Sequence, residues 1–158
     1  MNRESLISMA FILPIMMSMP AIAEEKGHSP KINSAKKIVT EFFDLAYIQR
    51  LPTEAAIKYI SSEKYTQHNP TGKDGREAFI NGFGKYIKES NYTYAIKRII
   101  AEDDLVVIHS QGFVNPNDAK DLGEAVIDIY RVEKDKIVEH WDVIQLVPEK
   151  SANKNTMF

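Results

Sequence analysis

The apolar residues of this chain change their spacing once, and that change constrains the fold more than any other feature. Before Tyr92 they recur every three or four residues, which is the period of an amphipathic helix. From Tyr92 onward they alternate with polar residues, which is typical of half-buried strands. A chain that forms its helices first and its strands afterwards is predicted to have an α+β fold.

This pattern predicts three helices and four strands. The helices cover residues 34–50, opened by Ser34; 52–60, with Pro52 in the first turn; and 74–89, where Asp74 and Glu77 have the spacing of a capping box. The strands cover 92–101, 104–114, 123–133 and 136–147. We therefore expect one domain over 34–147, followed by a flexible tail over 148–158.

The first 23 residues have the features of a signal peptide. Arg3 precedes an apolar stretch from Leu6 to Met19, and a small-residue cleavage sequence ends at Ala23. An uncleaved anchor is the alternative, but the stretch contains Pro14 and is shorter than the roughly 20 residues of a spanning helix. We expect an exported protein, periplasmic or secreted, with residues 24–33 as a linker and no stable membrane insertion after cleavage.

Composition excludes several classes of function. The formal net charge of -2 provides no basic surface, so no nucleic-acid partner is expected. The chain has no cysteine, which excludes disulfides, thiol catalysis and thiolate metal ligands.

The last two strands are predicted to form a hairpin, and its register decides which side chains meet. With a three-residue loop over 133–135, Asp128 faces His140 across the hairpin. One face of the sheet then carries Asp128, Tyr130, His140 and Asp142. A two-residue loop would instead separate Asp128 from the face of His140 and Asp142.

The helices should cover this face, where two carboxylates and an imidazole are costly unless they are hydrogen-bonded or used in chemistry. Desolvation raises the proton affinity of a carboxylate, which suits Asp142 to move a proton at a carbon next to a carbonyl group. His140 is expected to orient Asp142 or to share its proton. The candidates for contact with a small-molecule substrate are Tyr65, Gln67, His68, His109, Asp128 and Tyr130.

Two alternatives remain open for the histidines. Each one alone could be a structural residue bonded to the backbone. A zinc or iron site could be built from His68, His109 and His140 with a carboxylate. No HxH or HxxxH ligand pair supports the metal site, so we expect neither a metal nor another cofactor.

The opposite face of the hairpin is apolar. It carries Trp141 together with Ile127, Ile129 and Val143. Such a surface is unfavourable in water, so we predict a homodimer that forms through the outer faces of two sheets.

Three segments of the chain, in this order, resemble the SnoaL-like family of the nuclear transport factor 2-like superfamily. They are "YTQHNP" (65–70), "DLVVIHSQG" (104–112) and "AVIDIYRVEKDKIVEHWDVIQ" (125–145), and the resemblance covers about 34–147. It implies a cone-like α+β barrel in which a curved, mainly antiparallel sheet wraps around the N-terminal helices and encloses a pocket. It also implies dimers through the outer sheet face.

The resemblance extends to chemistry. The polyketide cyclases of this family close a ring by intramolecular aldol condensation without a cofactor, using a pocket aspartate as acid and base. By resemblance Asp142 takes that role, and Asp128 stands where those cyclases have a second pocket residue, a histidine. Tyr65, Gln67 and His68 would then line the mouth of the pocket.

Two hypotheses follow. The first is an acid-base enzyme that acts on a small carbonyl compound by aldol condensation or isomerisation, with Asp142 as acid and base. The second is a non-catalytic module of the same fold that binds a small apolar or aromatic ligand. Because one fold can host many functions, the resemblance supports the fold more strongly than the reaction.

Overall fold

The computed structural model describes residues 30–158, with side-chain environments from Ser34 onward. The predicted signal peptide and residues 24–29 of the predicted linker lie outside the described residues. Within residues 30–158, no helix is long and apolar enough to cross a membrane.

The helices come first in the chain, as predicted. Helix α1 (Pro30–Phe43) continues into a π-helical turn, η1 (Asp44–Ile48), and α2 (Pro52–Tyr59) follows with its proline in the first turn. The third predicted helix consists of α3 (Arg76–Phe79), the π-helical turn η2 (Ile80–Gly84) and α4 (Lys85–Glu89). Helix α1 begins at Pro30, before the predicted start at Ser34.

The capping box predicted at Asp74 and Glu77 is wrong. Gly75 precedes α3 with a φ of 98°, a conformation that favours glycine, and no side chain caps the helix. Asp74 Oδ1 instead accepts a hydrogen bond from the backbone N–H of Gln67 at 2.8 Å. The backbone N–H of Gly75 donates to the carbonyl of Tyr65, also at 2.8 Å, so the two ends of the loop 65–75 are joined.

The strands form one five-stranded sheet with the order β1-β5-β4-β3-β2. The four long strands confirm the prediction from alternation and pair antiparallel, whereas the two-residue strand β1 runs parallel to β5. Their bounds are β1 (Thr66–Gln67), β2 (Thr93–Glu102), β3 (Leu105–Phe113), β4 (Glu124–Glu133) and β5 (Lys136–Leu146).

The register predicted for the β4–β5 hairpin is wrong, although the predicted shared face exists. The loop has two residues, Lys134 and Asp135, both with positive φ, as in the tight turns that match the twist of a hairpin. The pairing then shifts by one residue between Arg131 and Val132, where the β5 strand carries an extra residue. Because of this bulge His140 pairs with Tyr130 and Asp142 pairs with Asp128, so all four side chains share one face.

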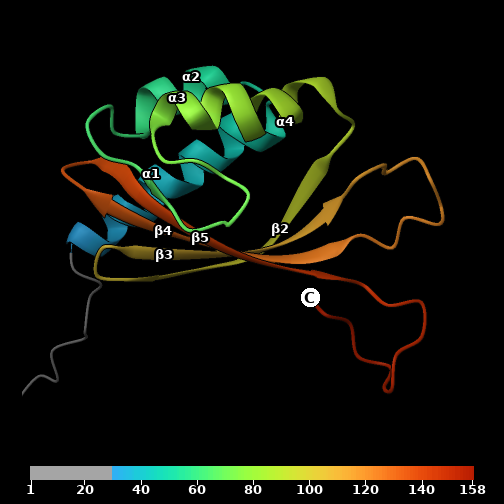
Figure 1. Cartoon of the computed structure of the whole chain (residues 1–158). Coiled ribbons are helices and arrows are strands. Elements are labelled where there is room, and N and C mark those ends of the chain that lie inside the picture. The colour runs from blue at the N-terminus through green and yellow to red at the C-terminus, as the bar shows by residue number, and fades with distance from the viewer. Residues whose placement is uncertain (1–29) are drawn as a thin grey trace, which may run out of the picture.

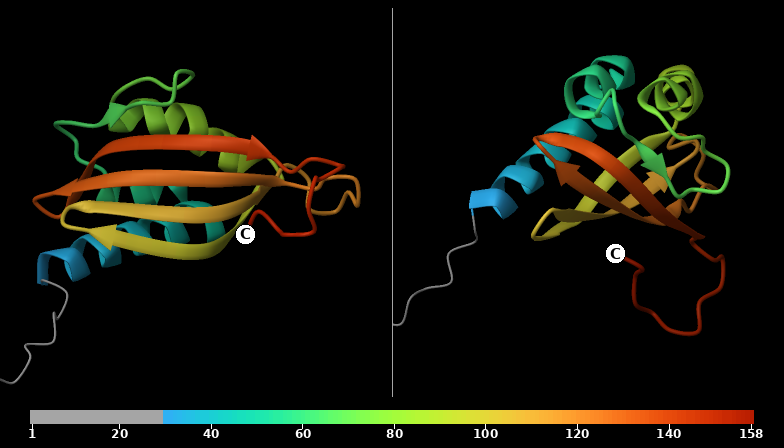
Figure 2. Two further views of the ribbon diagram at one scale, coloured as in Figure 1. Left: turned by 90° about the horizontal axis from the view of Figure 1, so that it is seen from below. Right: turned by 60° about the vertical axis from the view of Figure 1, so that its left-hand side comes forward.

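The helices lie on one side of the sheet, and the sheet curves around them (Figures 1 and 2). Phe42, on α1, is fully buried at the centre of this packing. Its ring centroid lies 5.7 Å from that of Tyr130 on the sheet and 5.8 Å from that of Phe79 on α3. Removing such a ring costs about 3–5 kcal/mol, so these contacts help to hold the helices over the inner face of the sheet.

The chain after β5 runs back beneath the sheet, on the side opposite the helices (Figure 1). Residues 148–158 form no helix or strand. The ring of Phe158 stacks on His109 with centroids 5.8 Å apart, and Lys97 Nζ lies 5.1 Å from the same ring. The end of the tail therefore contacts the outer face of the sheet.

Candidate functional site

Two parallel segments, β1 and β5, carry the candidate site. Gln67 is paired with His140, and the backbone N–H of His68 donates to the carbonyl of His140 at 2.9 Å. Because side chains alternate between the faces of a strand, Gln67 points inward with His140, whereas His68 points outward. The stretches 65–70 and 139–142 are therefore joined by hydrogen bonds and contribute side chains to the same inner face.

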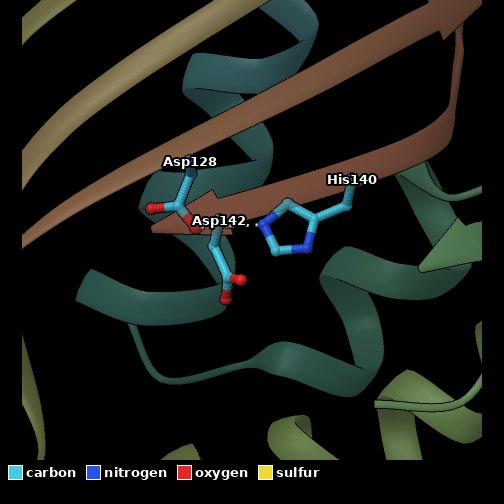
Figure 3. Close-up of side chains that lie close together, drawn as sticks. All are labelled: Asp128, His140 and Asp142. Carbon is cyan, nitrogen blue, oxygen red and sulfur yellow. Dashed lines mark hydrogen bonds and ion pairs between the residues drawn. The ribbon is translucent and has the colours of Figure 1, made fainter. Parts of the chain in front are cut away.

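The inward-pointing side chains form a hydrogen-bonded cluster, of which Figure 3 shows Asp128, His140 and Asp142. His140 Nε2 lies 3.0 Å from Asp128 Oδ1, and His140 Nδ1 lies 3.0 Å from Gln67 Oε1. Asn69 Nδ2 donates to both carboxylate oxygens of Asp142, at 2.9 and 2.8 Å. One oxygen or nitrogen from each of Asp128, His140 and Asp142 lies within 4.8 Å of the others.

The network determines which ring nitrogen of His140 carries a proton. Gln67 Oε1 accepts the backbone N–H of Asn69 at 2.9 Å, and because a backbone N–H can only donate, this atom must be the amide oxygen. His140 Nδ1 must therefore donate its proton to Gln67. A single further proton then lies between His140 Nε2 and Asp128 Oδ1, on one atom or the other.

The same logic assigns the amide of Asn69. Its Oδ1 accepts hydrogen bonds from the backbone N–H and the hydroxyl of Thr71, at 2.9 and 2.6 Å. Its Nδ2 is therefore the atom that faces Asp142. The Asp142 carboxylate is half-buried and held in one orientation by this amide.

The two carboxylates, Asp128 and Asp142, differ in how deeply they are buried. Asp128 is only 5% exposed, and burial raises its pKa, an effect that the hydrogen bond and charge of His140 partly offset and the nearby Asp142 reinforces. The sequence argument expected Asp142 to be the desolvated carboxylate. The structure gives that environment to Asp128, on the interior strand β4, whereas Asp142 on β5 is only half-buried.

Tyrosines surround the buried carboxylate. Burial, followed by the charge of Asp128, raises the pKa values of Tyr65 and Tyr130, so their hydroxyls stay protonated and can donate hydrogen bonds. The ring of Tyr130 stacks on His140 with centroids 4.7 Å apart. Two buried atoms here, Tyr130 Oη and Asp128 Oδ2, have no hydrogen-bond partner among the residues that the structure describes.

One imidazole and two carboxylates within 4.8 Å could in principle hold a divalent cation. His140 Nε2 and Asp128 Oδ1 already bond to each other at 3.0 Å, so an ion would have to break that bond. These three residues also differ from the metal ligands considered from the sequence, because His68 and His109 lie on the outer face of the sheet.

Comparison with known proteins places the fold in a family. The model of the SnoaL-like domain matches residues 39–140, more than half of the chain. The protein belongs to the SnoaL-like family. No curated protein matches the sequence at a significant level.

Solved structures share the fold of this SnoaL-like protein at low sequence identity. A putative SnoaL-like polyketide cyclase from Jannaschia sp. CCS1 has a TM-score of 0.62 at 13% identity, covering 76% of this chain and 91% of its own. A putative polyketide cyclase from Acidithiobacillus ferrooxidans has a TM-score of 0.56 at 20% identity, with coverage of 70% and 87%. A putative ketosteroid isomerase from Kribbella flavida has a TM-score of 0.60 at 10% identity, with coverage of 78% and 86%. These likenesses confirm the cone-like α+β fold.

The prediction that His68 lines the mouth of the inner pocket is wrong. Its ring points to the outer face of the SnoaL-like domain, where Nε2 lies 2.8 Å from Glu139 Oε1. The ring also stacks on Trp141 with centroids 4.6 Å apart and an interplanar angle of 7°. His68 is next to the two site residues Gln67 and Asn69 but on the other side of the strand.

His109 also lies outside the site. It is paired with Ile127 and Arg98 in the sheet, contacts Arg98 through Nδ1, and stacks on Phe158. Partial burial, and then the charges of Arg98 and Lys97, lower its pKa. The alternation of His109 with Leu105 and Val107 was identified correctly, but those residues belong to the outer face.

The other predicted site residues lie together. Gln67, Asp128, His140 and Asp142 form the hydrogen-bonded cluster, and Tyr130 stacks on it. Tyr65 is buried, with its ring packed edge-on against Phe79 at 6.5 Å between centroids, so it is a core residue near the cluster. The expectation that His140 orients Asp142 is wrong, because Asn69 takes that place.

Asn69 is the residue that sequence reasoning missed. It lies in the "YTQHNP" stretch, and its alternation with Gln67 was the signal that could have placed it on the inner face. A surface pocket of about 180 Å³ lies elsewhere, between Ser34, Ala35, Val132, Lys134 and Asp135, and includes no predicted site residue.

Proposed function

We propose that this SnoaL-like protein is a cofactor-independent acid-base enzyme that moves a proton at a carbon next to a carbonyl group. The reaction class would be aldol cyclisation or isomerisation of a small carbonyl compound. The observation that carries the proposal is the half-buried carboxylate of Asp142, fixed by Asn69, beside a histidine and aspartate that share a proton.

The roles follow from the hydrogen bonds. Asp142 would take the proton from the α-carbon, and the electron pair of the broken C–H bond would move toward the carbonyl oxygen. That oxygen gains charge, and the proton shared by His140 and Asp128 would stabilise it by leaving the hydrogen bond between those two side chains. In an aldol step the enolate carbon would then bond to a second carbonyl carbon, and the oxygen of that carbonyl would take the proton held by Asp142. In an isomerisation the proton held by Asp142 would instead return to another carbon of the enolate.

The comparisons are compatible with this chemistry. Two solved structures of the same fold are described as a putative polyketide cyclase and a putative ketosteroid isomerase. At 20% and 10% identity they support the fold alone, so the reaction of this protein rests on its own site.

Solvent deuterium exchange tests the proposal without knowledge of the natural substrate. A panel of small ketones and β-keto esters is incubated in D2O, and loss of the α-proton signal is followed by proton NMR. We expect exchange with the wild type and a loss of about 10²- to 10⁴-fold with Asp142→Asn, the range for a positioned acid-base group. Asp118→Asn is the matched control, because Asp118 is an exposed loop aspartate.

Exchange that survives in Asp142→Asn while the fold is intact would rule out the role of Asp142. The alternative function, a non-catalytic binding module, predicts compounds that bind and are not exchanged by any variant. Asp142→Asn should melt at a temperature close to that of the wild type, since its amide can keep one hydrogen bond within the cluster.

We also propose a homodimer through the outer sheet face. A row of apolar side chains crosses four strands there, because the pairing aligns Ile100, Val107, Ile129 and Trp141. Ile100 and nearby Val143 are 58% and 67% exposed. Light scattering after gel filtration should give twice the chain mass, and Val107→Lys should give the mass of one chain.

The location of the protein is a separate proposal. The N-terminal sequence 1–23 supports export with cleavage after Ala23. Mass spectrometry of the protein from its native host should show a chain that starts at Glu24, whereas an intact Met1 would contradict export by cleavage.

A further inference from the structure

A cluster on the outer face lies directly behind the candidate site. The ring of His68 stacks on Trp141, and its Nε2 lies 2.8 Å from Glu139 Oε1. Glu139 also accepts a hydrogen bond from Arg131 Nε at 2.9 Å, and the Arg131 guanidinium lies 5.7 Å from the centre of the Trp141 ring. We call His68, Arg131, Glu139 and Trp141 the outer clasp.

The strand that the outer clasp holds has few other attachments. Strand β1 is two residues long and lies at the edge of the sheet. The backbone N–H of His68 donates to the carbonyl of His140. The other main-chain hydrogen bonds described above for the loop 65–75 run within the loop itself. A two-residue strand makes too few ladder bonds to fix its own position, so side chains must contribute.

Both inward residues depend on this segment. Gln67 bonds His140 and Asn69 bonds Asp142, and His68 is the residue between them. Each side of the segment is thus tied to β5, by two amides inside and one imidazole outside. A shift of His68 would move both amides away from the groups they orient.

We infer that His68 is a positioning residue, whose outer clasp keeps Gln67 on His140 and Asn69 on Asp142. Its effect on turnover rests on the proposed function, whereas its effect on the His140 hydrogen bond follows from the geometry alone. The inference assigns a task to the histidine of the "QHNP" stretch that does not require it to touch a substrate.

A merely structural histidine would act differently. The side chain of His68 is 40% exposed, and exposed ion pairs contribute little to global stability. Removing His68 should therefore loosen the loop 65–75 locally and leave global unfolding almost unchanged. Local opening without global unfolding is the signature that separates the two roles.

Two readouts test the inference. The first is the rate at which the His140 Nδ1 proton exchanges with water, followed by nitrogen-15 NMR of the imidazole; the second is kcat in the deuterium exchange assay. His68→Ala should speed proton exchange at least about tenfold and lower kcat by about 10- to 100-fold, the cost of a displaced catalytic group. His68→Phe keeps the stacking on Trp141 and should recover part of both effects.

His109→Ala is the matched control, because His109 is the other described histidine on the outer face and does not contact β1. It should leave both readouts within about twofold of the wild type. His68→Ala values that also stay within twofold would overturn the inference. So would a parallel fall in melting temperature and proton protection across His68→Ala and His68→Phe, because that pattern indicates global unfolding.

The two proposals fail separately. Faster exchange of the His140 proton in His68→Ala, with no turnover by the wild type on any compound, would support the positioning role and contradict the proposed enzyme. Normal turnover and normal proton exchange in His68→Ala would support the enzyme and contradict the positioning role.

Discussion

Replacing Tyr130 with phenylalanine should stabilise the protein. Tyr130 is 1% exposed, and its hydroxyl has no hydrogen-bond partner of normal geometry among the described residues; the hydroxyl of Tyr47 interacts with it only weakly. A buried polar group without a partner costs about 1–3 kcal/mol, and Tyr130→Phe removes that cost. The ring contacts with Phe42 and His140 are retained, because phenylalanine has the same ring.

The free energy of unfolding, measured by urea denaturation, should therefore rise by about 1–3 kcal/mol. In a chain of this size each kcal/mol corresponds to about 2–4 °C in melting temperature. Turnover should fall in the same variant, because the hydroxyl stands beside the His140 and Asp128 pair, where it can donate to a substrate oxygen. Stability gained at the expense of activity is the expected pattern at a functional site.

Tyr92→Phe is the matched control, since it deletes the same atom from another buried tyrosine. The Tyr92 hydroxyl donates to a carboxylate oxygen of Glu124. Loss of a hydrogen bond to a charged group should cost about 1.5–3 kcal/mol, so the two variants should change stability in opposite directions. A loss of more than about 1 kcal/mol in Tyr130→Phe would refute the reasoning, because it would show that the hydroxyl is satisfied.

Two further predictions concern the carboxylates. Burial raises the pKa of Asp128, so the folded chain holds the proton of this carboxyl group more tightly than the unfolded chain does. The resulting contribution to the free energy of unfolding is full below about pH 3.9 and is lost as pH rises through the folded pKa. Asp128→Asn lacks this dependence, so the stability of the wild type relative to the variant should fall as pH rises above about 4 in urea titrations, and a difference that rises with pH would contradict it. Asn69→Ala removes the donor that orients Asp142 and should lower kcat about tenfold or more, with little change in melting temperature. The control is Asn81→Ala, which removes an exposed hydrogen bond to the backbone of α3 and should leave kcat unchanged. Equal kcat in the two asparagine variants would show that Asp142 needs no help from Asn69.

The sequence was sufficient for the order of elements and for the residues of the inner cluster that lie on β4 and β5. The change of period at Tyr92 marks the boundary between helices and strands, and the four long strands lie where alternation places them. Asp128, Tyr130, His140 and Asp142 were predicted to share a face, and they do. Period-2 alternation is a local property, so it can be read from the chain without knowledge of its partners.

The register of the hairpin could not be read in the same way. A three-residue loop and a two-residue loop followed by a bulge bring Asp128 to the same face, and the bulge leaves no simple mark in the composition of β5. The correct face was thus reached through an incorrect loop. Register depends on the energy of the whole pairing, which a single strand does not reveal.

The predictions for the positions of His68 and His109 were wrong for a different reason. Both faces of this sheet are apolar, since the outer row contains Val107, Ile129 and Trp141, so alternation with apolar residues does not identify the inner face. The face to which His68 points depends on the register of the two-residue strand β1, and a shift of that register by one residue would move the side chain to the opposite face. Asn69 was missed because an asparagine before proline is usually explained by the turn alone.

The most direct test of the account is the protonation of His140 in the unliganded protein. Nitrogen-15 NMR at neutral pH distinguishes a ring nitrogen that carries a proton from one that does not. The account predicts a protonated Nδ1, hydrogen-bonded to Gln67, and an Nε2 whose signal changes in Asp128→Asn because it shares a proton with that carboxyl group. A proton on Nε2 with a bare Nδ1, unaffected by Asp128→Asn, would contradict the shared proton on which the proposed chemistry depends.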